Sequence, residues 1–332
     1  MKKKGTFLLL FFLLTLLSGC SSKHTPLSKT GFYFDTVITV TIYDSSKEEV
    51  LDECFALAEY YENLLSATKE GSDIWNINHA SSSPVTVSQE TAALLEKAVY
   101  YGELTDGLID PTIAPLSSLW NFSSENAQTH TVPSDHEIAE KLSHVDYHRL
   151  SIDGLSVTLS DPDAAVDLGF IAKGYIADRM KECLLQHQID SAVIDLGGNV
   201  LTLGNKPDGS PYVIGIQTPF AERGVSLGTV SVSDCSVVSS GIYERYFEKD
   251  GILYHHILDT NTGYPIDNAL SAVTILAPSS LDADALSTAC FALGPESGKE
   301  LIESLPDTEA LFITKKGERI ATDGFLLRSP SY

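Results

Sequence analysis

The sequence predicts an α+β fold with largely antiparallel sheets flanked by helices, arranged as two intimate subdomains of one domain. Many short β-branched segments are joined only by turns, as in residues 190–203, and this spacing is typical of hairpins. Amphipathic helical segments occur between them at irregular intervals, without the regular strand–helix alternation of a parallel sheet. The pair Gly197-Gly198 lacks the G-x-G-x-x-G spacing, and no helix is expected after it, which argues against a Rossmann fold.

The first residues predict a lipoprotein leader. Three lysines at positions 2–4 precede an apolar run at 7–17 and the sequence Leu-Ser-Gly-Cys at 17–20. The run is too short for a permanent membrane span, so residues 1–19 are expected to be a signal peptide. Cys20 would then carry the lipid anchor, residues 20–30 would form a tether, and 31–328 would fold outside the cytoplasm at the membrane surface.

Composition and charge limit the class of protein. The content of 43% hydrophobic and 20% charged residues is that of a globular chain. Without the three leader lysines, 19 basic and 45 acidic residues remain, a formal charge of −26, so nucleic acid is not an expected partner. Cys54, Cys183, Cys235 and Cys290 show no metal-ligand spacing and are expected to be buried free thiols, although an extracytoplasmic location leaves a disulfide open.

The first half of the domain begins with an expected strand. Residues 32–43 alternate in the way that predicts a strand entering a sheet. Residues 47–65 have helical spacing of apolar side chains, which predicts an amphipathic helix. Ser72 is placed to cap a short helix, and Ser88 is placed to cap a longer one that ends near Leu104.

The second half of the domain is expected to continue with strands and helices. A helix capped by Ser134 or Asp135 comes first, and residues 155–159 and 165–168 then predict a hairpin. Further strands are expected within 190–203, 212–217, 227–232, 272–277 and 310–314, and helices at 176–187, around 284–293 and at 296–304.

Asp284 and Thr288 are the candidate metal ligands. They lie four residues apart on an expected helix, so one face presents a carboxylate and a hydroxyl to the same point. Mg²⁺ prefers oxygen ligands and usually also binds substrate phosphates. The alternative is that Asp282 and Asp284 only favour the start of the helix through its dipole.

Other polar residues point to an anionic ligand. Residues 167–175 form a glycine-bearing strand-to-helix junction, a natural cradle for phosphate, to which Lys173 adds a cation unless it is simply a solvated helix lysine. Arg245 offers a fork of donors for an acid or a phosphate. His256 and Asp259 precede a turn, and His256 is either a structural histidine or a base that titrates near neutrality.

Together these segments resemble the ApbE family of FAD:protein FMN transferases. The resemblance spans about residues 31–325 and consists of blocks that occur in the family's order. The blocks lie at residues 34–36, 66–78, 107–122, 167–175, 195–199, 240–245, 256–265 and 283–288.

The resemblance implies an FAD pocket and a metal site. The residues implied to contact the flavin nucleotide are Phe34, Thr68, Leu108, Ile109, Asp110, Asp167, Lys173, Gly197, Gly198, Asn199, Arg245, His256 and Ile257. The implied metal ligands are the main-chain carbonyl of Phe170 and the side chains of Asp284 and Thr288. The residues alone leave alternatives open. Phe34 can equally be an ordinary core aromatic, and Asp110 can cap the turn that follows it. Gly197 and Gly198 can simply form a hairpin turn.

The activity implied by the resemblance is Mg²⁺-dependent transfer of FMN from FAD to a Thr or Ser hydroxyl of a target protein, with release of AMP. His256 would be the catalytic base and Asp259 would orient it. The expected partners are FAD and extracytoplasmic electron-transfer flavoproteins. Two alternatives remain open: an FAD pyrophosphatase that uses water as acceptor, and a non-catalytic flavin-binding lipoprotein.

Overall fold

The computed structural model describes residues 25–44, 46–122 and 131–329. The expected signal peptide and lipidated Cys20 lie outside the described residues. Within these ranges, no helix combines the length and the apolar character that crossing a membrane requires.

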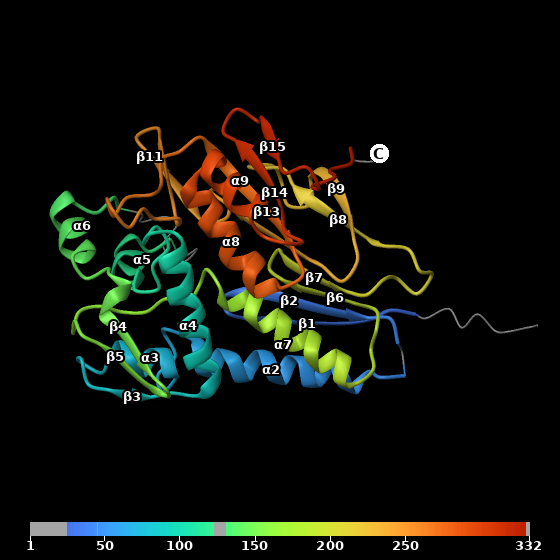
Figure 1. Ribbon diagram of the computed structural model, residues 1–332, viewed down its shortest axis with the longest axis horizontal. Coiled ribbons are helices and arrows are strands. Elements are labelled where there is room, and N and C mark those ends of the chain that lie inside the picture. Colours follow the sequence, from blue (N-terminus) through green and yellow to red (C-terminus); the bar gives the residue numbers. More distant parts are fainter. Residues whose placement is uncertain (1–24, 45, 123–130, 330–332) are drawn as a thin grey trace, which may run out of the picture.

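An eight-stranded sheet organises the larger part of the chain, and every neighbouring pair in it is antiparallel (Figure 1). Its strands, in spatial order, are β1 (Leu27–Tyr33), β2 (Thr36–Ile42), β6 (Ala192–Leu196), β7 (Asn199–Leu203), β10 (Ser236–Gly241), β13 (Leu270–Ala277), β14 (Glu309–Thr314) and β15 (Arg319–Ala321). The β6–β7 hairpin and the strands β13 and β14 lie where the sequence predicts them.

The N-terminal edge of this sheet differs from the sequence-based expectation. Residues 32–43 are not one strand, because Phe34 and Asp35 turn the chain with φ values of 52° and 56° and separate β1 from β2. Two consecutive positive φ values are typical of a two-residue hairpin turn. Strand β1 also begins at Leu27, inside the predicted tether, because hydroxyl pairs such as Ser28–Thr41 extend the ladder without apolar alternation. The folded part therefore starts before residue 31.

Both faces of the eight-stranded sheet are covered. Ala310 and Phe312 of β14 point into the main core beneath the helices, whereas Leu311 and Ile313 point into a second core beneath a separate hairpin. That hairpin is β8 (Tyr212–Gln217) with β9 (Ser226–Val232). The helices on the first face are α2 (Glu49–Leu65), α7 (Ala172–Gln186), α8 (Ser280–Leu293) and α9 (Pro295–Glu303) (Figure 1).

A smaller part of the chain lies beside α2 and α8 (Figure 1). Its elements are α3 (Asp73–Asn78), β3 (Val85–Thr86), α4 (Gln89–Leu104), α5 (Ala114–Trp120), α6 (Asp135–Leu142), η3 (Tyr147–Arg149), β4 (Leu150–Asp153), β5 (Ser156–Leu159) and the hairpin β11 (Tyr246–Lys249) with β12 (Ile252–His255). Ser72, Ser88 and Ser134 cap α3, α4 and α6, as predicted.

One predicted hairpin in this smaller part is wrong. Strand β5 pairs with β4 and β3, not with residues 165–168, which form no strand. The turn at Gly154 brings β4 and β5 together, and Ala165 instead bridges to Ile113. The main core runs without a break from this part into the large sheet. The predicted α+β class with antiparallel sheets and flanking helices is confirmed.

Candidate active site at the meeting of two helices

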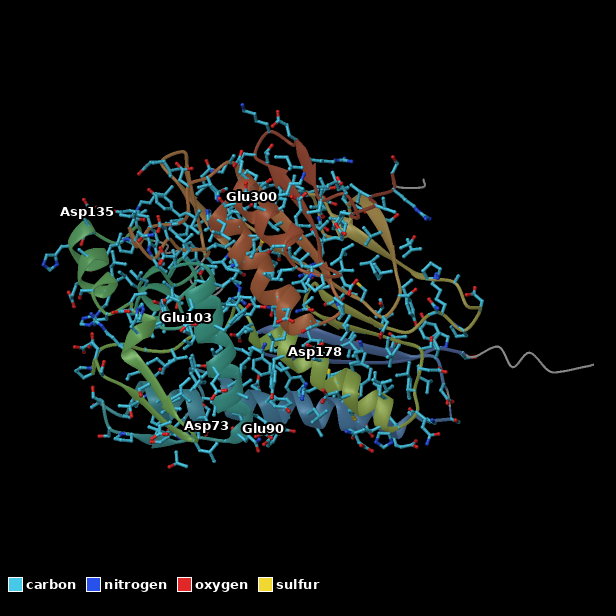
Figure 2. All side chains as sticks on the ribbon, viewed as in Figure 1. Asp73, Glu90, Glu103, Asp135, Asp178 and Glu300 are labelled. Atoms are coloured by element: carbon cyan, nitrogen blue, oxygen red, sulfur yellow. The ribbon has the colours of Figure 1, made fainter. Side chains whose placement is uncertain are left out.

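The centre of the site is the contact between α7 and the start of α8. A Cβ on Gly174 would lie 2.2 Å from the carbonyl oxygen of Ser280, so only glycine allows this approach. Asp178, one turn further along α7, accepts hydrogen bonds from the N–H groups of Ser280 and Leu281, each at 2.9 Å. Figure 2 shows Asp178 at this junction. The sequence analysis missed Asp178, whose carboxylate fixes the start of α8.

Asp284 is buried at this junction, with 4% of its surface exposed. Its Oδ2 accepts a hydrogen bond from the Gly174 N–H at 2.9 Å, and its Oδ1 lies 3.5 Å from the Lys173 ammonium. Burial raises the pKa of Asp284, and the charge of Lys173 opposes that rise. Asp282 is the acidic residue in the first turn of α8, and it accepts a hydrogen bond from Tyr101. Asp284, in contrast, contacts α7 and so does more than stabilise the start of its own helix. Lys173 is an ion-pair partner and not a freely solvated lysine.

The carbonyl of Phe170 is left available by the same arrangement. In a regular helix the Gly174 N–H would donate to the carbonyl four residues earlier, which is that of Phe170. Here the Gly174 N–H donates to Asp284 instead. Among the described residues no hydrogen bond reaches the Phe170 carbonyl, whereas the neighbouring carbonyls of Leu168 and Ile171 both accept one.

Thr288 lies on the same face of α8 and contacts β10. Its Oγ1 is 3.2 Å from the Ser240 Oγ, which is also 2.7 Å from the Ser287 Oγ. With Asp284 and Phe170, the site offers a carboxylate, a hydroxyl and a free carbonyl, all of them oxygen donors. These residues fit a hard divalent cation, and the Lys173 ammonium already shows that the Asp284 carboxylate attracts positive charge.

The predicted glycine turn faces this junction from the large sheet. Gly197 and Gly198 join β6 to β7 with φ values of 65° and 98°, and a Cβ on Gly198 would meet no atom within 4 Å. Asn199 follows, buried, with its Oδ1 accepting from the Ser280 Oγ at 2.8 Å. Its Nδ2 lies near enough to Asp284 to lower the pKa of that carboxyl group. Within the described chain, however, Nδ2 makes no hydrogen bond of normal geometry. An unused buried donor beside an open turn suits an anionic ligand.

His256 lies at the edge of this group and is half-buried. Its Nδ1 is 3.2 Å from the carbonyl oxygen of Arg245, which can only accept, so Nδ1 carries the proton and Nε2 keeps its lone pair. Burial, together with the positive charges of Arg245 and Lys173, lowers the pKa of His256 to about 3. The imidazole is therefore neutral at physiological pH.

Among the described residues no hydrogen bond joins Asp259 to His256. The Asp259 Oδ1 accepts from the N–H of Asn261 at 2.8 Å, and its backbone closes a turn with Tyr264 and Gly263. These local turn hydrogen bonds engage the short side chain, and its predicted orienting role stays a prediction. The hydrogen-bond partner of His256 in the structure is the Arg245 carbonyl.

Leu108, Ile109 and Asp110, which the resemblance implies to contact the flavin, lie in a loop next to the loop that follows His256. Thr260, in the loop after His256, donates to the carbonyl of Gly107 at 2.7 Å. Asp110 is buried, and its carboxylate is engaged by Thr112 and by the N–H of Tyr147, so it caps a turn as the alternative interpretation held. Ile109 is buried and Leu108 is half-buried in the same segment.

Asp167 and Ile257 also have structural partners. Asp167 accepts from the N–H of Gly169 and from the hydroxyl of Ser117, and thereby holds the junction before α7 against α5. Ile257 is a buried core residue. Its neighbour His255, which the analysis did not single out, is also buried, with its Nε2 3.1 Å from the Ile266 carbonyl oxygen.

Phe34 and Thr68 lie in two loops that Glu62 of α2 connects. The Glu62 Oε1 accepts a hydrogen bond from the Phe34 N–H at 2.7 Å, and the Glu62 Oε2 lies 4.0 Å from the Lys69 Nζ. Phe34 is half-buried and packs against the main core, and Thr68 is exposed. The Phe34 turn adjoins the glycine turn, since a Cβ on Gly197 would meet Thr36. No contact with Asp284 or Lys173 is found for either residue within the part of the chain described.

Comparison with known proteins identifies the family. The ApbE family model matches residues 34–312. An FAD:protein FMN transferase of Klebsiella pneumoniae is 39% identical over 86% of this chain and 88% of its own length, and one of Treponema pallidum is 37% identical over 86% and 84%.

Solved structures agree with this family. The crystal structure of the ApbE protein from Thermotoga maritima superposes with a TM-score of 0.82 at 31% identity, covering 91% of this chain and 98% of that one. The flavin transferase ApbE from Vibrio cholerae superposes with a TM-score of 0.80 at 29% identity and the same coverage. The chain therefore belongs to the ApbE family, whose named relatives are FAD:protein FMN transferases.

Proposed function

We propose that this protein is an FAD:protein FMN transferase that requires Mg²⁺ and joins FMN to a Thr or Ser hydroxyl of a target flavoprotein, releasing AMP. The observation that supports the proposal most directly is the buried Asp284 carboxylate beside the free Phe170 carbonyl. A site for simple flavin binding needs neither a buried acid with a cation partner nor a neutral imidazole at its edge.

The ends of the two helices and the glycine turn form the surroundings that a diphosphate requires. Lys173 and Arg245 supply positive charge, and the charges of both contribute to the lowered pKa of His256. The Asn199 Nδ2 group is an available donor, and the open side of Gly198 lets a ligand approach the backbone. In a chain with 45 acidic residues against 22 basic ones, this local positive group favours an anionic substrate.

Bound at Asp284, Thr288 and the Phe170 carbonyl, Mg²⁺ would polarise the diphosphate and neutralise charge on it. The acceptor hydroxyl oxygen attacks the phosphorus of the FMN half, and a new phosphorus–oxygen bond forms. The bond between this phosphorus and the bridging oxygen breaks, and AMP leaves with the bridging oxygen. The proton of the hydroxyl passes to the Nε2 lone pair of His256.

Substrate binding would also make His256 a stronger base. The positive charges of Arg245 and Lys173 contribute to the low pKa of His256 in the free protein. A bound diphosphate carries negative charge to these two side chains and offsets their effect, so the pKa of His256 rises. The base is then effective mainly when FAD is in place.

We also propose that the enzyme is anchored by a lipid on Cys20 at the outer face of the cell membrane. The sequence Leu-Ser-Gly-Cys after an apolar segment supports this location. The acceptors would then be electron-transfer flavoproteins with domains on the same side.

The test is to incubate the purified protein with FAD, Mg²⁺ and a Thr-bearing acceptor peptide, and to weigh the peptide by mass spectrometry. We expect a gain equal to one FMN, lost with EDTA and in Asp284→Ala. His256→Ala is expected to bind FAD but not to transfer FMN. His148→Ala, an exposed histidine paired with Asp146, is the matched control and should transfer normally.

The other outcomes identify the alternatives. Free FMN and AMP with an unmodified peptide would indicate an FAD pyrophosphatase. Intact bound FAD would indicate a non-catalytic flavin-binding protein. Full transfer by His256→Ala would refute the assignment of the base.

A further inference from the structure

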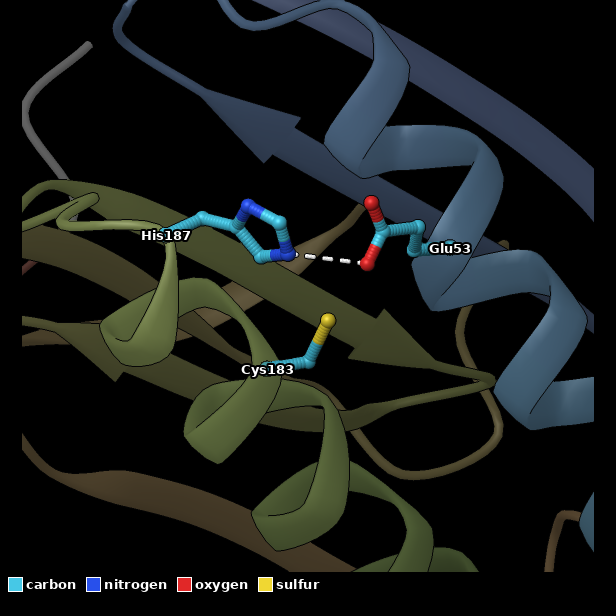
Figure 3. A group of neighbouring side chains, drawn as sticks. All are labelled: Glu53, Cys183 and His187. Atoms are coloured by element: carbon cyan, nitrogen blue, oxygen red, sulfur yellow. Dashed lines mark hydrogen bonds and ion pairs between the residues drawn. The ribbon is translucent and has the colours of Figure 1, made fainter.

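A group of side chains that could bind a metal ion lies apart from Asp284, where α2 passes the C-terminal end of α7. It consists of Glu53 from α2 and of Cys183 and His187 from α7 (Figure 3). One ligand atom from each residue lies within 4.8 Å of the others, and the His187 Nε2 is 2.8 Å from the Glu53 Oε2. Figure 3 shows the thiol of Cys183 and the imidazole of His187 both directed toward the carboxylate.

The backbone explains why these three side chains converge. Cys183 and His187 are four residues apart at the end of α7, so they share one face, and the His187 N–H still donates to the Cys183 carbonyl. Glu53 comes from a different helix, which packs along α7. Two ligands are thus fixed by one helix and the third by its neighbour.

The donor set is selective in its chemistry. A thiolate, an imidazole and a carboxylate are the ligands of zinc, whereas Mg²⁺ and Ca²⁺ take oxygen ligands. At metal–ligand distances of about 2.1 Å for nitrogen and oxygen, tetrahedral geometry separates two such ligand atoms by roughly 3.4 Å. The 2.8 Å contact of His187 with Glu53 need open only slightly to admit an ion.

The position at a helix end adds a favourable field. The last turn of α7 contains no basic residue, and carbonyl groups at a helix C-terminus attract positive charge. Lys47 is a neighbouring cation, and its ammonium donates to the main-chain carbonyls of His187 and Gln188, not to the three ligand side chains. Two of the three side chains are accessible, since His187 is 38% exposed and Glu53 52% exposed, whereas Cys183 is partly buried.

A similar cluster elsewhere in the protein shows the contrast. His144, Asp161 and Asp163 also gather ligand atoms within 4.8 Å. There the guanidinium of Arg149 already bonds to Asp161 and supplies the counter-charge. No ammonium or guanidinium is paired with Glu53 among the residues that the structure describes.

We propose that Glu53, Cys183 and His187 bind one zinc-class divalent cation, with water as the fourth ligand, and that this ion joins α2 to the C-terminal end of α7. The site is distinct from the one at Asp284. Gly174 and Cys183 are nine residues apart on α7, which places the two sites roughly 14 Å apart along its axis. The ion would stabilise the helix whose other end positions Lys173 and Phe170.

The test uses the full chain, reduced and in detergent, with excess Mg²⁺ to occupy oxygen-ligand sites. Co²⁺ is titrated as a spectroscopic probe, and Zn²⁺ is then added to displace it. We expect one Co²⁺ per chain with a near-ultraviolet thiolate-to-cobalt band, which disappears on addition of Zn²⁺. Cys183→Ser and His187→Ala should abolish the band and weaken binding at least about 100-fold, since even loss of an indirect partner costs about 10–100-fold.

Two controls keep the test decisive. Cys235→Ser removes a thiol that hydrogen-bonds to the Ser236 carbonyl, away from the cluster, and should keep the band. Zn²⁺ should raise the Tm of the parent protein but not that of Cys183→Ser, because a ligand that binds only the folded state stabilises it. A Cys183→Ser protein that is folded by circular dichroism and still binds Co²⁺ with the parent affinity overturns the proposal, as does a folded, reduced parent without the band. Neither result bears on FMN transfer, which is measured separately.

Discussion

Replacing Gly174 with alanine tests whether the close contact of α7 with α8 builds the active site. The added Cβ would lie 2.2 Å from the Ser280 carbonyl oxygen and 2.7 Å from the Leu281 Cα, whereas ordinary contacts begin at 3.4 Å. The difference between 3.4 and 2.2 Å requires a shift of about 1.2 Å, and both atoms belong to backbone that cannot rotate away.

The expected magnitudes follow from this shift. Helix propensity alone would favour alanine by about 1 kcal/mol, but overpacking costs about 1–3 kcal/mol and occasionally more. With backbone on one side of the clash, we expect a net loss of about 2 kcal/mol of unfolding free energy. Metal–ligand distances tolerate deviations of about 0.2 Å, and a 1 Å misplacement of reacting groups can lower the rate about 100-fold. The rate of FMN transfer should therefore fall about 100-fold in Gly174→Ala.

Urea unfolding and FMN transfer at saturating Mg²⁺ measure the two effects. Gly215→Ala is the matched control, because Gly215 is exposed on β8 and its new Cβ would come no closer than 3.3 Å to the Ser226 hydroxyl. We expect this control to keep both stability and activity. A Gly174→Ala protein as stable and active as the control would falsify the close-contact argument.

Three further predictions concern buried charge. Burial is the main reason that the pKa of His255 is lowered from 6.5 to about 4 in the folded protein. Between pH 6.5 and 4 the unfolded chain therefore binds a proton at this histidine that the folded protein does not. The free energy of unfolding should fall by about 3 kcal/mol as the pH falls through this range. His255→Gln should flatten this dependence in unfolding measured from pH 6.5 to 4, and an unchanged slope would contradict the assignment. Lys173→Met leaves the Asp284 carboxylate without its ion-pair partner. The loss in Tm should therefore be larger without Mg²⁺ than with Mg²⁺, which can replace the ammonium. Equal losses would mean that Mg²⁺ and the Lys173 ammonium do not share Asp284. Asp178→Ala removes three hydrogen bonds at the start of α8 and should cost about 1–2 kcal/mol in urea unfolding, whereas an unaffected protein would show that α8 needs no such cap.

Local signals in the sequence were sufficient for most helices and for several strands. Ser72 and Ser88 predict two helix starts because capping depends on a few adjacent residues. The hairpin expected from residues 155–168 is wrong because a strand's partner is chosen by packing, and two candidate partners flanked β5. The turn at Phe34 was missed because a phenylalanine with positive φ has no local signal.

The candidate site was predictable only where its residues share a helix face or a turn. Asp284 and Thr288 were singled out by their four-residue spacing, and the resemblance to the family favoured the role of metal ligands over that of a helix start. Asp178 was missed because the N–H groups that it caps are 102 and 103 residues away in sequence. Cys183 and His187 have the same four-residue spacing as Asp284 and Thr288, but the third ligand, Glu53, comes from another helix and has no signal in the local sequence.

The edge position of β1 has a mechanical consequence. In the described chain, β1 pairs only with β2, and its first residue, Leu27, lies opposite Ile42 at the open end of the hairpin. A pull on the N-terminus therefore loads one rung of the ladder at a time and peels β1 away from Leu27 toward the turn at Phe34. The remaining seven strands stay paired while this happens. In a protein anchored through the proposed lipid on Cys20, β1 would therefore separate from β2 before tension reaches the helix junction.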